Sequence, residues 1–221
     1  MKNTVLENTA SQDQQTRDRL IQAAVELFSE RGFKRMTVRE ICQAASTNVA
    51  AVNYHFRDKF GLYTAVIQTA IDAMRSATEA SMEAGKGRPA EEKLRAYIRV
   101  YLRHITDDGS ASWIHQLMNH EMTDPTSALE MIFEQAIRPR VKYLSGIIGE
   151  LMGIPASDER VFRCAASIQG QCLIYVYKPV RDRFMPGGQF SPAAIAKTAD
   201  HIAEFSLAGI RRCRTRVKSG R

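Results

Sequence analysis

Hydrophobic positions recur every three or four residues along most of this chain, and no stretch alternates like a half-buried strand. This periodicity predicts an all-α fold with about nine helices. The predicted helices span residues 17–31, 37–44, 48–55, 59–83, 90–106, 110–122, 125–152, 158–183 and 192–212. Residues 1–15 are polar and aperiodic, so we expect them to form a flexible arm.

Residues of the types that cap helix ends mark the limits of the first helices. Gly32 is placed to end the first helix, because glycine adopts the left-handed conformation at low cost. Thr37 and Glu40 have the spacing of a capping box, in which each side chain satisfies a free backbone amide. Asn48 and Asp58 are expected to cap the third and fourth helices.

Proline and glycine mark the breaks in the rest of the chain. The best linker candidate is the run Gly85–Pro89, and we accordingly expect an N-terminal domain over 16–75 and a larger domain over 76–212. Pro139 falls inside the long seventh helix and is expected to kink it, while Pro179 is expected to kink or end the next helix.

The first three predicted helices have the layout of a helix-turn-helix, with the motif itself at about 37–56. In this layout the third helix enters the major groove of DNA. At about 100° per residue, Val49, Val52 and Phe56 fall on one arc of that helix and are expected to pack on the first two helices. The opposite face is then free to meet a duplex.

The outward face of the third helix combines small residues with tyrosine, histidine and asparagine. Small side chains let the backbone sink into a groove, and Asn53 can bridge an adenine edge. Tyr54 and His55 can donate to phosphates, and Lys59 lies at a helix start, where free amides favour a phosphate. The candidate DNA contacts are Thr37, Arg39, Thr47, Asn48, Ala50, Ala51, Asn53, Tyr54, His55 and Lys59.

This segment resembles the DNA-binding domain of the TetR family of bacterial regulators. The resemblance covers residues 14–70 and rests on AAVELFSERGF in the first helix, TVREI in the second, and NYHFRDKFGLY at the end of the recognition region. It implies DNA contacts at the positions given above, apart from Arg39 and Thr47. Ser46 stands where the family has glycine, and Phe60 replaces an acid, so we expect a looser start of the fourth helix.

The rest of the chain resembles the CecR-like branch of that family, in stretches 117–126, 136–140 and 170–175. This resemblance implies an all-helical ligand domain and a twofold dimer. Bulky apolar side chains and a few polar ones in this region predict a pocket for an aromatic or amphipathic effector, whose binding would move the fourth helix and release a repressor from a palindromic operator. The candidate pocket residues are Tyr97, Tyr101, His104, Trp113, Met118, Glu121, Met122, Phe133, Gln169 and Tyr175.

The last two predicted helices carry apolar stripes interrupted by small residues that permit close crossing. We expect them to pair with their copies in a four-helix interface of a homodimer. The alternative is that both helices belong only to the core of one chain. The candidate interface residues are Ala165, Ile168, Cys172, Ile195, Ala199, Ile202 and Phe205.

The composition adds little to these predictions. With 44% hydrophobic and 25% charged residues and no apolar run near the roughly 18 residues that span a bilayer, we expect a cytoplasmic protein without membrane contact. The net charge is +7, and residues 211–221 alone carry six Lys or Arg and no acid. We interpret the tail over 213–221 as solvated rather than bound to DNA.

Two other functions stay open as alternatives. A helical metal-dependent enzyme is disfavoured, because His115 and His120 are five residues apart and point about 140° away from each other on a helix. No catalytic, cofactor or metal-binding residue is predicted. A thiol redox sensor would need a bridge between subunits, since Cys164 and Cys172 lie about 12 Å apart along one helix.

Overall fold

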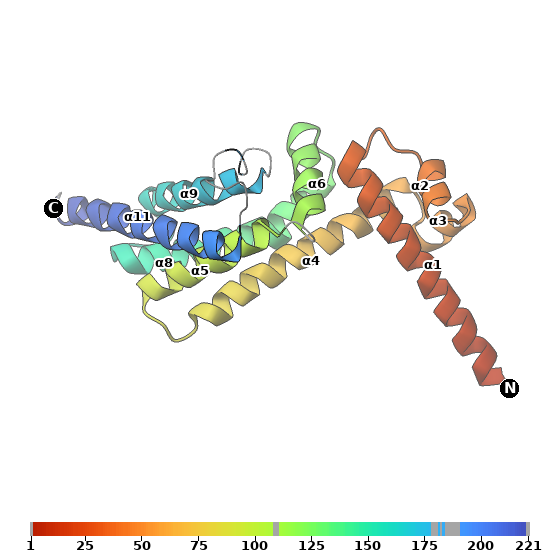
Figure 1. Ribbon diagram of the computed structural model, residues 1–221, viewed down its shortest axis with the longest axis horizontal. Coiled ribbons are helices and arrows are strands. Elements are labelled where there is room, and N and C mark those ends of the chain that lie inside the picture. Colours follow the sequence, from red (N-terminus) through yellow and green to blue (C-terminus); the bar gives the residue numbers. More distant parts are fainter. Residues whose placement is uncertain (1, 108–110, 178–180, 182, 184–190, 220–221) are drawn as a thin grey trace. The chain divides into compact units, whose positions relative to one another are not determined.

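The computed structural model describes residues 2–107, 111–177, 181, 183 and 191–219, and this part of the chain forms helices and no strand. The all-α prediction is therefore confirmed. The chain forms two compact units (Figure 1). The N-terminal unit comprises Met1–Asp72 and Trp113–Ile132, and the C-terminal unit comprises Ala73–Ser112 and Phe133–Arg221. None of the described helices is long and apolar enough to cross a membrane.

The N-terminal unit is built mainly from short helices around α1. Its elements are α1 (Lys2–Arg31), α2 (Val38–Ala44), α3 (Val49–Phe56), the first half of α4 (Lys59–Gly85), α6 (Ala111–Thr123) and α7 (Ala128–Ile132). Helix α1 begins at Lys2 rather than near residue 17, so the predicted arm is helical. Residues 2–16 contain neither glycine nor proline, and nothing in them interrupts the helical backbone.

The predicted end of α1 and start of α2 are confirmed. Gly32 has φ of +77° and donates its amide to the Phe28 carbonyl at 2.9 Å, as expected of a helix C-terminal glycine. A Cβ at Gly32 would also lie 3.0 Å from the His120 ring, so two constraints favour glycine there. The capping box is complete: the Thr37 amide donates to Glu40 Oε2 at 2.9 Å, and the Glu40 amide donates to Thr37 Oγ1 at 3.3 Å.

Both Asn48 and Asp58 cap the helices that follow them. Asn48 Oδ1 accepts the Ala51 amide at 3.0 Å, and Asp58 Oδ1 accepts the Gly61 amide at 2.8 Å. The expectation that Phe60 loosens the start of α4 is wrong. Asp58 caps α4 without an acidic partner, and the ring of Phe60 packs edge-on against Phe33 at a centroid distance of 5.8 Å.

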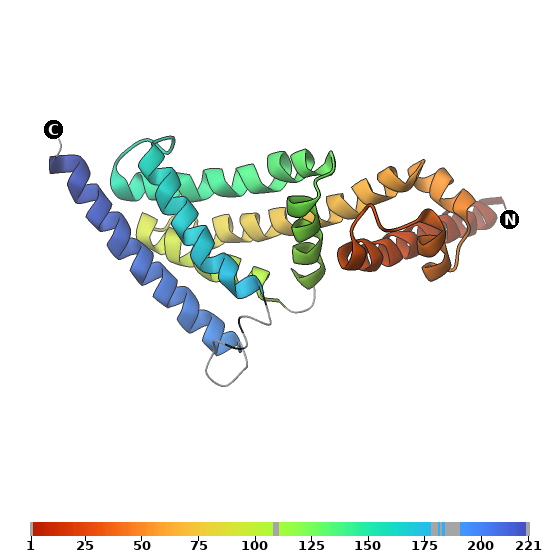
Figure 2. The same cartoon turned by 90° about the horizontal axis from the view of Figure 1, so that it is seen from above.

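Helices α5 (Ala90–Ile105), α8 (Arg138–Met152), α9 (Glu159–Leu173) and α11 (Pro192–Ser219) pack together in the C-terminal unit. Helices α9 and α11 lie side by side and cross α5 and α8 obliquely (Figure 2). The core between them consists of aliphatic side chains with two tyrosines. Its fully buried members include Leu94, Tyr97, Ile98, Leu102, Leu144, Ile148, Val161, Ile168, Cys172, Ile202 and Leu207.

Two predicted helices of the C-terminal region differ from the structure in their extent, and the first is interrupted next to Pro139, where a kink was expected. Residues 125–152 form α7, a π-helical segment η1 (Phe133–Ile137) and α8, because Pro139 supplies no amide and its ring clashes with the carbonyl four residues earlier. Helix α9 ends at Leu173 and is followed by the short 3-10 turn η2 (Ile174–Val176). The expected kink at Pro179 lies outside the described residues.

The predicted domain boundaries also differ from the observed units. Gly85–Pro89 is a tight turn between α4 and α5 inside the C-terminal unit, with the Lys86 amide donating to the Glu83 carbonyl at 3.1 Å. The boundary falls within α4, after Asp72, and residues 113–132 group with the N-terminal unit rather than with the larger domain. Helix α11 continues to Ser219, into the predicted tail.

Ser46, in the turn between α2 and α3, has φ of +52°, a left-handed conformation that favours glycine. We predict that Ser46→Gly raises the free energy of unfolding by about 0.5–1 kcal/mol, because relief of the strain at Cβ exceeds the entropy gained by the unfolded chain. Urea unfolding followed by circular dichroism measures this change. Ser46→Ala keeps the Cβ and should give no gain; equal stability of the two variants would contradict the explanation.

Candidate nucleic-acid interface

Helix α3 has one buried face and one exposed face. Val52 and Phe56 are buried, as predicted, whereas Val49 is 41% exposed and does not belong to the core. Tyr54 is 75% exposed, and Ala50 and Asn53 are also exposed. A helix of eight residues has marginal stability by itself, so the two buried residues and the Asn48 cap hold it in place.

The structure places His55 differently from the prediction. Its side chain is only 7% exposed, and Nε2 lies 3.5 Å from Asp13 Oδ1 in α1. The expectation that His55 faces away from the core is therefore wrong. Tyr54 packs its ring edge-on against His55 at a centroid distance of 4.9 Å, so His55 supports the side chain that does point outward.

Lys59 lies at the first position of α4, as predicted, but its ammonium is folded over an aromatic ring. Nζ is 4.3 Å from the centroid of Phe33, an attractive cation–π geometry. Burial lowers the pKa of Lys59, and the nearby Glu40 carboxylate opposes that change. A phosphate contact by Lys59 requires the side chain to leave this ring.

The remaining candidates lie at the ends of α2 and α3. The Thr37 hydroxyl donates to Glu40 Oε2 at 2.6 Å, and the Thr47 hydroxyl donates to the Asn48 carbonyl at 3.3 Å. Arg39 is exposed, and Ala51 is half-buried. Arg57 is an exposed cation directly after α3. It is absent from the predicted DNA contacts, although a basic residue at the end of the third helix indicates a possible phosphate contact.

The predicted pocket residues divide between the two units. Those of the N-terminal unit are Trp113, Met118, Glu121 and Met122, and those of the C-terminal unit are Tyr97, Tyr101, His104, Phe133, Gln169 and Tyr175. Tyr97 and Tyr101 are buried with their rings stacked at 5.7 Å, and Gln169 Nε2 donates to Tyr97 Oη at 2.8 Å. Met122 and Phe133 are exposed.

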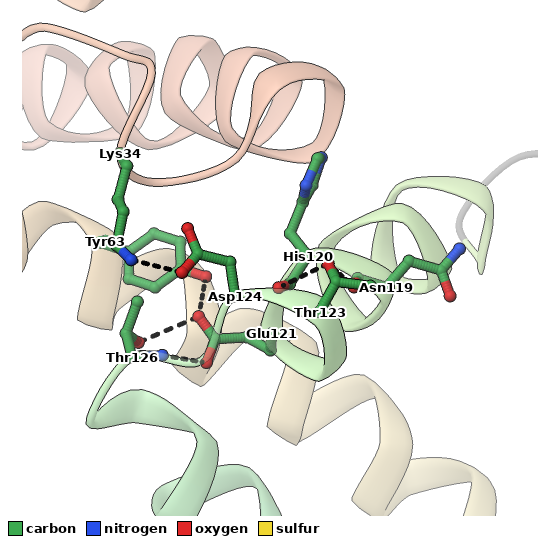
Figure 3. Close-up of polar contacts among 8 residues, drawn as sticks. All are labelled: Lys34, Tyr63, Asn119, His120, Glu121, Thr123, Asp124 and Thr126. Atoms are coloured by element: carbon green, nitrogen blue, oxygen red, sulfur yellow. Dashed lines mark hydrogen bonds and ion pairs between the residues drawn. The ribbon is translucent and has the colours of Figure 1, made fainter.

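Glu121 of α6 is a structural carboxylate in the interior of the N-terminal unit (Figure 3). It is 1% exposed and accepts hydrogen bonds from Tyr63 Oη at 2.5 Å, from the Thr126 amide at 3.0 Å and from Thr126 Oγ1 at 2.9 Å. Burial and the bonded carboxylate raise the pKa of Tyr63, so its hydroxyl remains a donor. These bonds join α4, α6 and the loop before α7, and they replace the predicted role of Glu121 as an effector anchor.

Two further contacts fix α6 to the end of α1 and the loop after it, and Figure 3 shows the one between Lys34 and Asp124. Lys34 forms an ion pair with Asp124, and His120 Nε2 donates to the Ser29 carbonyl at 3.1 Å. The ion pair is exposed and contributes little stability, whereas the His120 ring lies so close to Gly32 that a Cβ there would be 3.0 Å from Nδ1. The segment 113–132 is thereby an integral part of the unit that carries α3.

Most of the predicted dimer contacts are inside the core of a single chain. Ile195 is partly buried against that core, and only Phe205, at 65% exposure, is available to a partner. The fully buried ones are Ala165, Ile168, Cys172, Ala199 and Ile202. Helical spacing marks a buried stripe but does not say whether the same chain or a second copy covers it, so these five assignments are corrected.

Two observations bear on the alternative functions. No group of three or more His, Cys, Asp or Glu in the described part of the chain is arranged to hold a metal ion. Cys172 is fully buried, and burial raises its pKa to about 12, which disfavours the reactive thiolate. Burial also raises the pKa of Cys164, and the neighbouring Cys213 thiol, which is within hydrogen-bond distance, raises it further.

Comparison with known proteins assigns both parts of the chain. Residues 20–66 match the family described as bacterial regulatory proteins, tetR family, and residues 90–210 match the C-terminal domain of the HTH-type transcriptional dual regulator CecR. The second match alone covers more than half of the chain. The chain belongs to the TetR family. It is a DNA-binding transcriptional regulator with a CecR-like C-terminal domain.

Individual TetR-family relatives agree with this assignment. The chain is 29% identical over 171 residues to the dual regulator CecR of Shigella flexneri, covering 73% of this chain and 76% of that protein. It is 25% identical over 211 residues to the repressor NicS of Pseudomonas putida, covering 92% and 96%. A crystal structure of AibR with isovaleryl coenzyme A and operator DNA shares the fold, with TM-score 0.64, 19% identity and coverage of 86% and 97%.

We predict that Tyr63→Phe lowers the free energy of unfolding by about 1.5–3 kcal/mol, because the buried Glu121 carboxylate loses a donor. Thermal or urea unfolding measures the loss. Tyr143→Phe is the matched control, since Tyr143 Oη donates to the neutral Ser81 carbonyl at 3.3 Å and its removal should cost less. If both variants lost the same free energy of unfolding, the hydrogen bond to Glu121 would be no stronger than one to a neutral carbonyl.

Proposed function

We propose that two copies of this TetR-family regulator bind a palindromic operator through α3, and that a small-molecule effector bound in the C-terminal unit lowers operator affinity. The observation that carries the proposal is the outward face of α3, where exposed Tyr54 and small residues stand on a helix capped by Asn48. Small residues allow close approach to the groove, and the tyrosine hydroxyl supplies a phosphate donor. Action on chromosomal DNA implies a cytoplasmic protein.

The exposed apolar side chains of α9 and α11 support a homodimer. Phe162 and Phe205 are 63% and 65% exposed, which is unusual for phenylalanine on a free surface. A groove of about 460 Å³ lies between the two helices and is lined by residues that include Ser167, Phe205 and Gly209. Twofold pairing through the outer surfaces of α9 and α11 would bury both phenylalanines and present two copies of α3 to successive half-sites.

Two continuous helical segments connect the C-terminal unit, where the effector is proposed to bind, with the unit that contains α3. Helix α4 passes from the N-terminal unit into the C-terminal unit after Asp72, and α7 continues through η1 into α8. A ligand that changes the direction of α4 or α8 therefore acts on segments built into the DNA-reading unit. The shift in operator affinity equals the difference in effector affinity between the two conformations.

The DNA-binding face is tested by replacing Tyr54 and Lys59 together. We expect Tyr54→Phe/Lys59→Gln to weaken binding to a duplex from the promoter that the protein controls by about 10-fold or more, and to reduce the salt dependence of binding by about one phosphate contact. Fluorescence anisotropy at several salt concentrations measures both quantities. Lys142→Gln, an exposed lysine of the C-terminal unit, is the control; unchanged affinity in the double variant would refute this docking face.

The dimer is tested at Phe162 and Phe205. Phe162→Glu/Phe205→Glu should give a monomer, because it places two pairs of charges at a dry interface, and should thereby reduce operator affinity by at least about 100-fold. Light scattering coupled to size-exclusion chromatography measures the mass. Met82→Glu, which alters another exposed apolar residue, should remain a dimer. A monomeric wild-type protein, or a dimeric double variant, would rule out the α9–α11 interface.

A further inference from the structure

Arg140 is a partly buried cation of the C-terminal unit, and no described carboxylate compensates its charge. It lies in the first turn of α8, and its Nε is buried with no hydrogen-bond partner among the described residues. Its guanidinium carbon is 5.0 Å from the centroid of the Tyr101 ring, and no described carboxylate forms an ion pair with it. Buried donors are nearly always bonded in folded proteins, so this one points to a missing acceptor.

Arg138, two residues earlier on the same helix, differs from Arg140 in its exposure and in having an acidic partner. Arg138 is exposed and forms an ion pair with Glu134, four residues earlier. Both arginines follow the π-helical segment η1 and flank Pro139. Segments of π-helix re-aim the side chains near them and are frequent at functional sites, which is consistent with an arginine directed into the unit.

An unpartnered acceptor belongs to the same group of side chains. Gln169 Nε2 donates to Tyr97 Oη at 2.8 Å, whereas Gln169 Oε1 is buried without a donor among the described residues. Because Tyr97 Oη already accepts this bond, its own proton is free to be donated. The stacked rings of Tyr97 and Tyr101, at 5.7 Å and 15°, supply an aromatic wall.

Two further titratable neighbours, His104 and the protonated thiol of Cys172, do not compensate the Arg140 charge. Burial lowers the pKa of His104, Asp107 acts in the opposite direction, and the Arg140 charge lowers it again. Burial likewise raises the pKa values of Tyr97 and Tyr101, so both hydroxyls remain neutral. The cluster therefore offers cationic and neutral donors, one free acceptor and aromatic surface.

We propose that the cluster of Tyr97, Tyr101, Arg140 and Gln169 binds a small aromatic carboxylate that also carries a hydroxyl or amino donor. The carboxylate accepts from Arg140 and the Tyr97 hydroxyl, the ring packs on the tyrosines, and the donor meets Gln169 Oε1. This inference rests on the effector function proposed above and narrows the effector to one chemical class.

Isothermal titration of the full chain with three probes tests the site: 4-hydroxybenzoate, 4-hydroxyphenylacetate and 3-(4-hydroxyphenyl)propanoate. At least one acid should bind with a Kd below about 1 mM. Its neutral amide should bind about 10- to 100-fold more weakly, because the charge-assisted bonds to Arg140 are lost. Acetate, which has the charge without the ring, should not bind measurably.

Variants of Arg138 and Arg140 distinguish binding at the proposed site from a general effect of positive charge on the affinity for the acid. Arg140→Gln should weaken binding of the acid by about 10- to 100-fold, whereas Arg138→Gln should leave it unchanged. Arg140→Lys keeps the charge without the Nε donor and should fall between them. Gln169→Leu should reduce the preference for 4-hydroxybenzoate over benzoate, and it remains informative if Arg140→Gln fails to fold.

Several results would overturn the proposal. These are failure of all three acids to bind a folded wild-type chain, equal binding of an acid and its amide, or equal effects of Arg138→Gln and Arg140→Gln. Operator release is measured separately by anisotropy. Arg140-dependent binding without operator release would uphold the carboxylate site and contradict its effector role, while intact operator binding with no acid bound would overturn the site alone.

Discussion

The burial of the Glu121 carboxylate is the constraint on which the N-terminal unit depends. A carboxylate taken out of water is costly unless several donors satisfy it, and here Tyr63 of α4 and two groups of Thr126 do so. Those donors are in place only when α4, α6 and the loop before α7 are assembled. The helix-turn-helix is therefore not an independent three-helix domain, because residues 113–132, which lie within the CecR-like match, complete it.

This arrangement explains how a short recognition helix remains fixed and how it can still be regulated. Helix α3 is eight residues long and depends on Val52, Phe56 and the Asn48 cap for its position. Helices α1 and α2 pack against it, and the unit that contains all three continues into the C-terminal unit through α4 and through α7–η1–α8. In the proposed mechanism, a ligand bound in the C-terminal unit would act on α4 and α7, which already belong to the DNA-reading unit, without a separate coupling element.

Local chemistry allowed much of this fold to be predicted from sequence. The caps at Gly32, Thr37, Asn48 and Asp58 depend on a few neighbouring residues, and each forms the bond that its residue type indicates. Long-range pairings were not predictable in this way. Nothing near His55 in the sequence indicates Asp13, nothing near Glu121 indicates Tyr63, and helical spacing alone did not tell a self-covered stripe on α9 from an exposed one. Whether Arg140 Nε finds an acceptor likewise depends on the side chains around it in three dimensions, and none of the described residues supplies one.

The most direct test of this account is native-state hydrogen exchange of the α6 amides. If residues 113–123 are part of the DNA-reading unit, their opening free energies should match those of α1 and the start of α4, and Tyr63→Phe should lower all of them together. The account would be contradicted if α6 opened with α5 and α8 instead, or if Tyr63→Phe left the exchange of α6 unchanged.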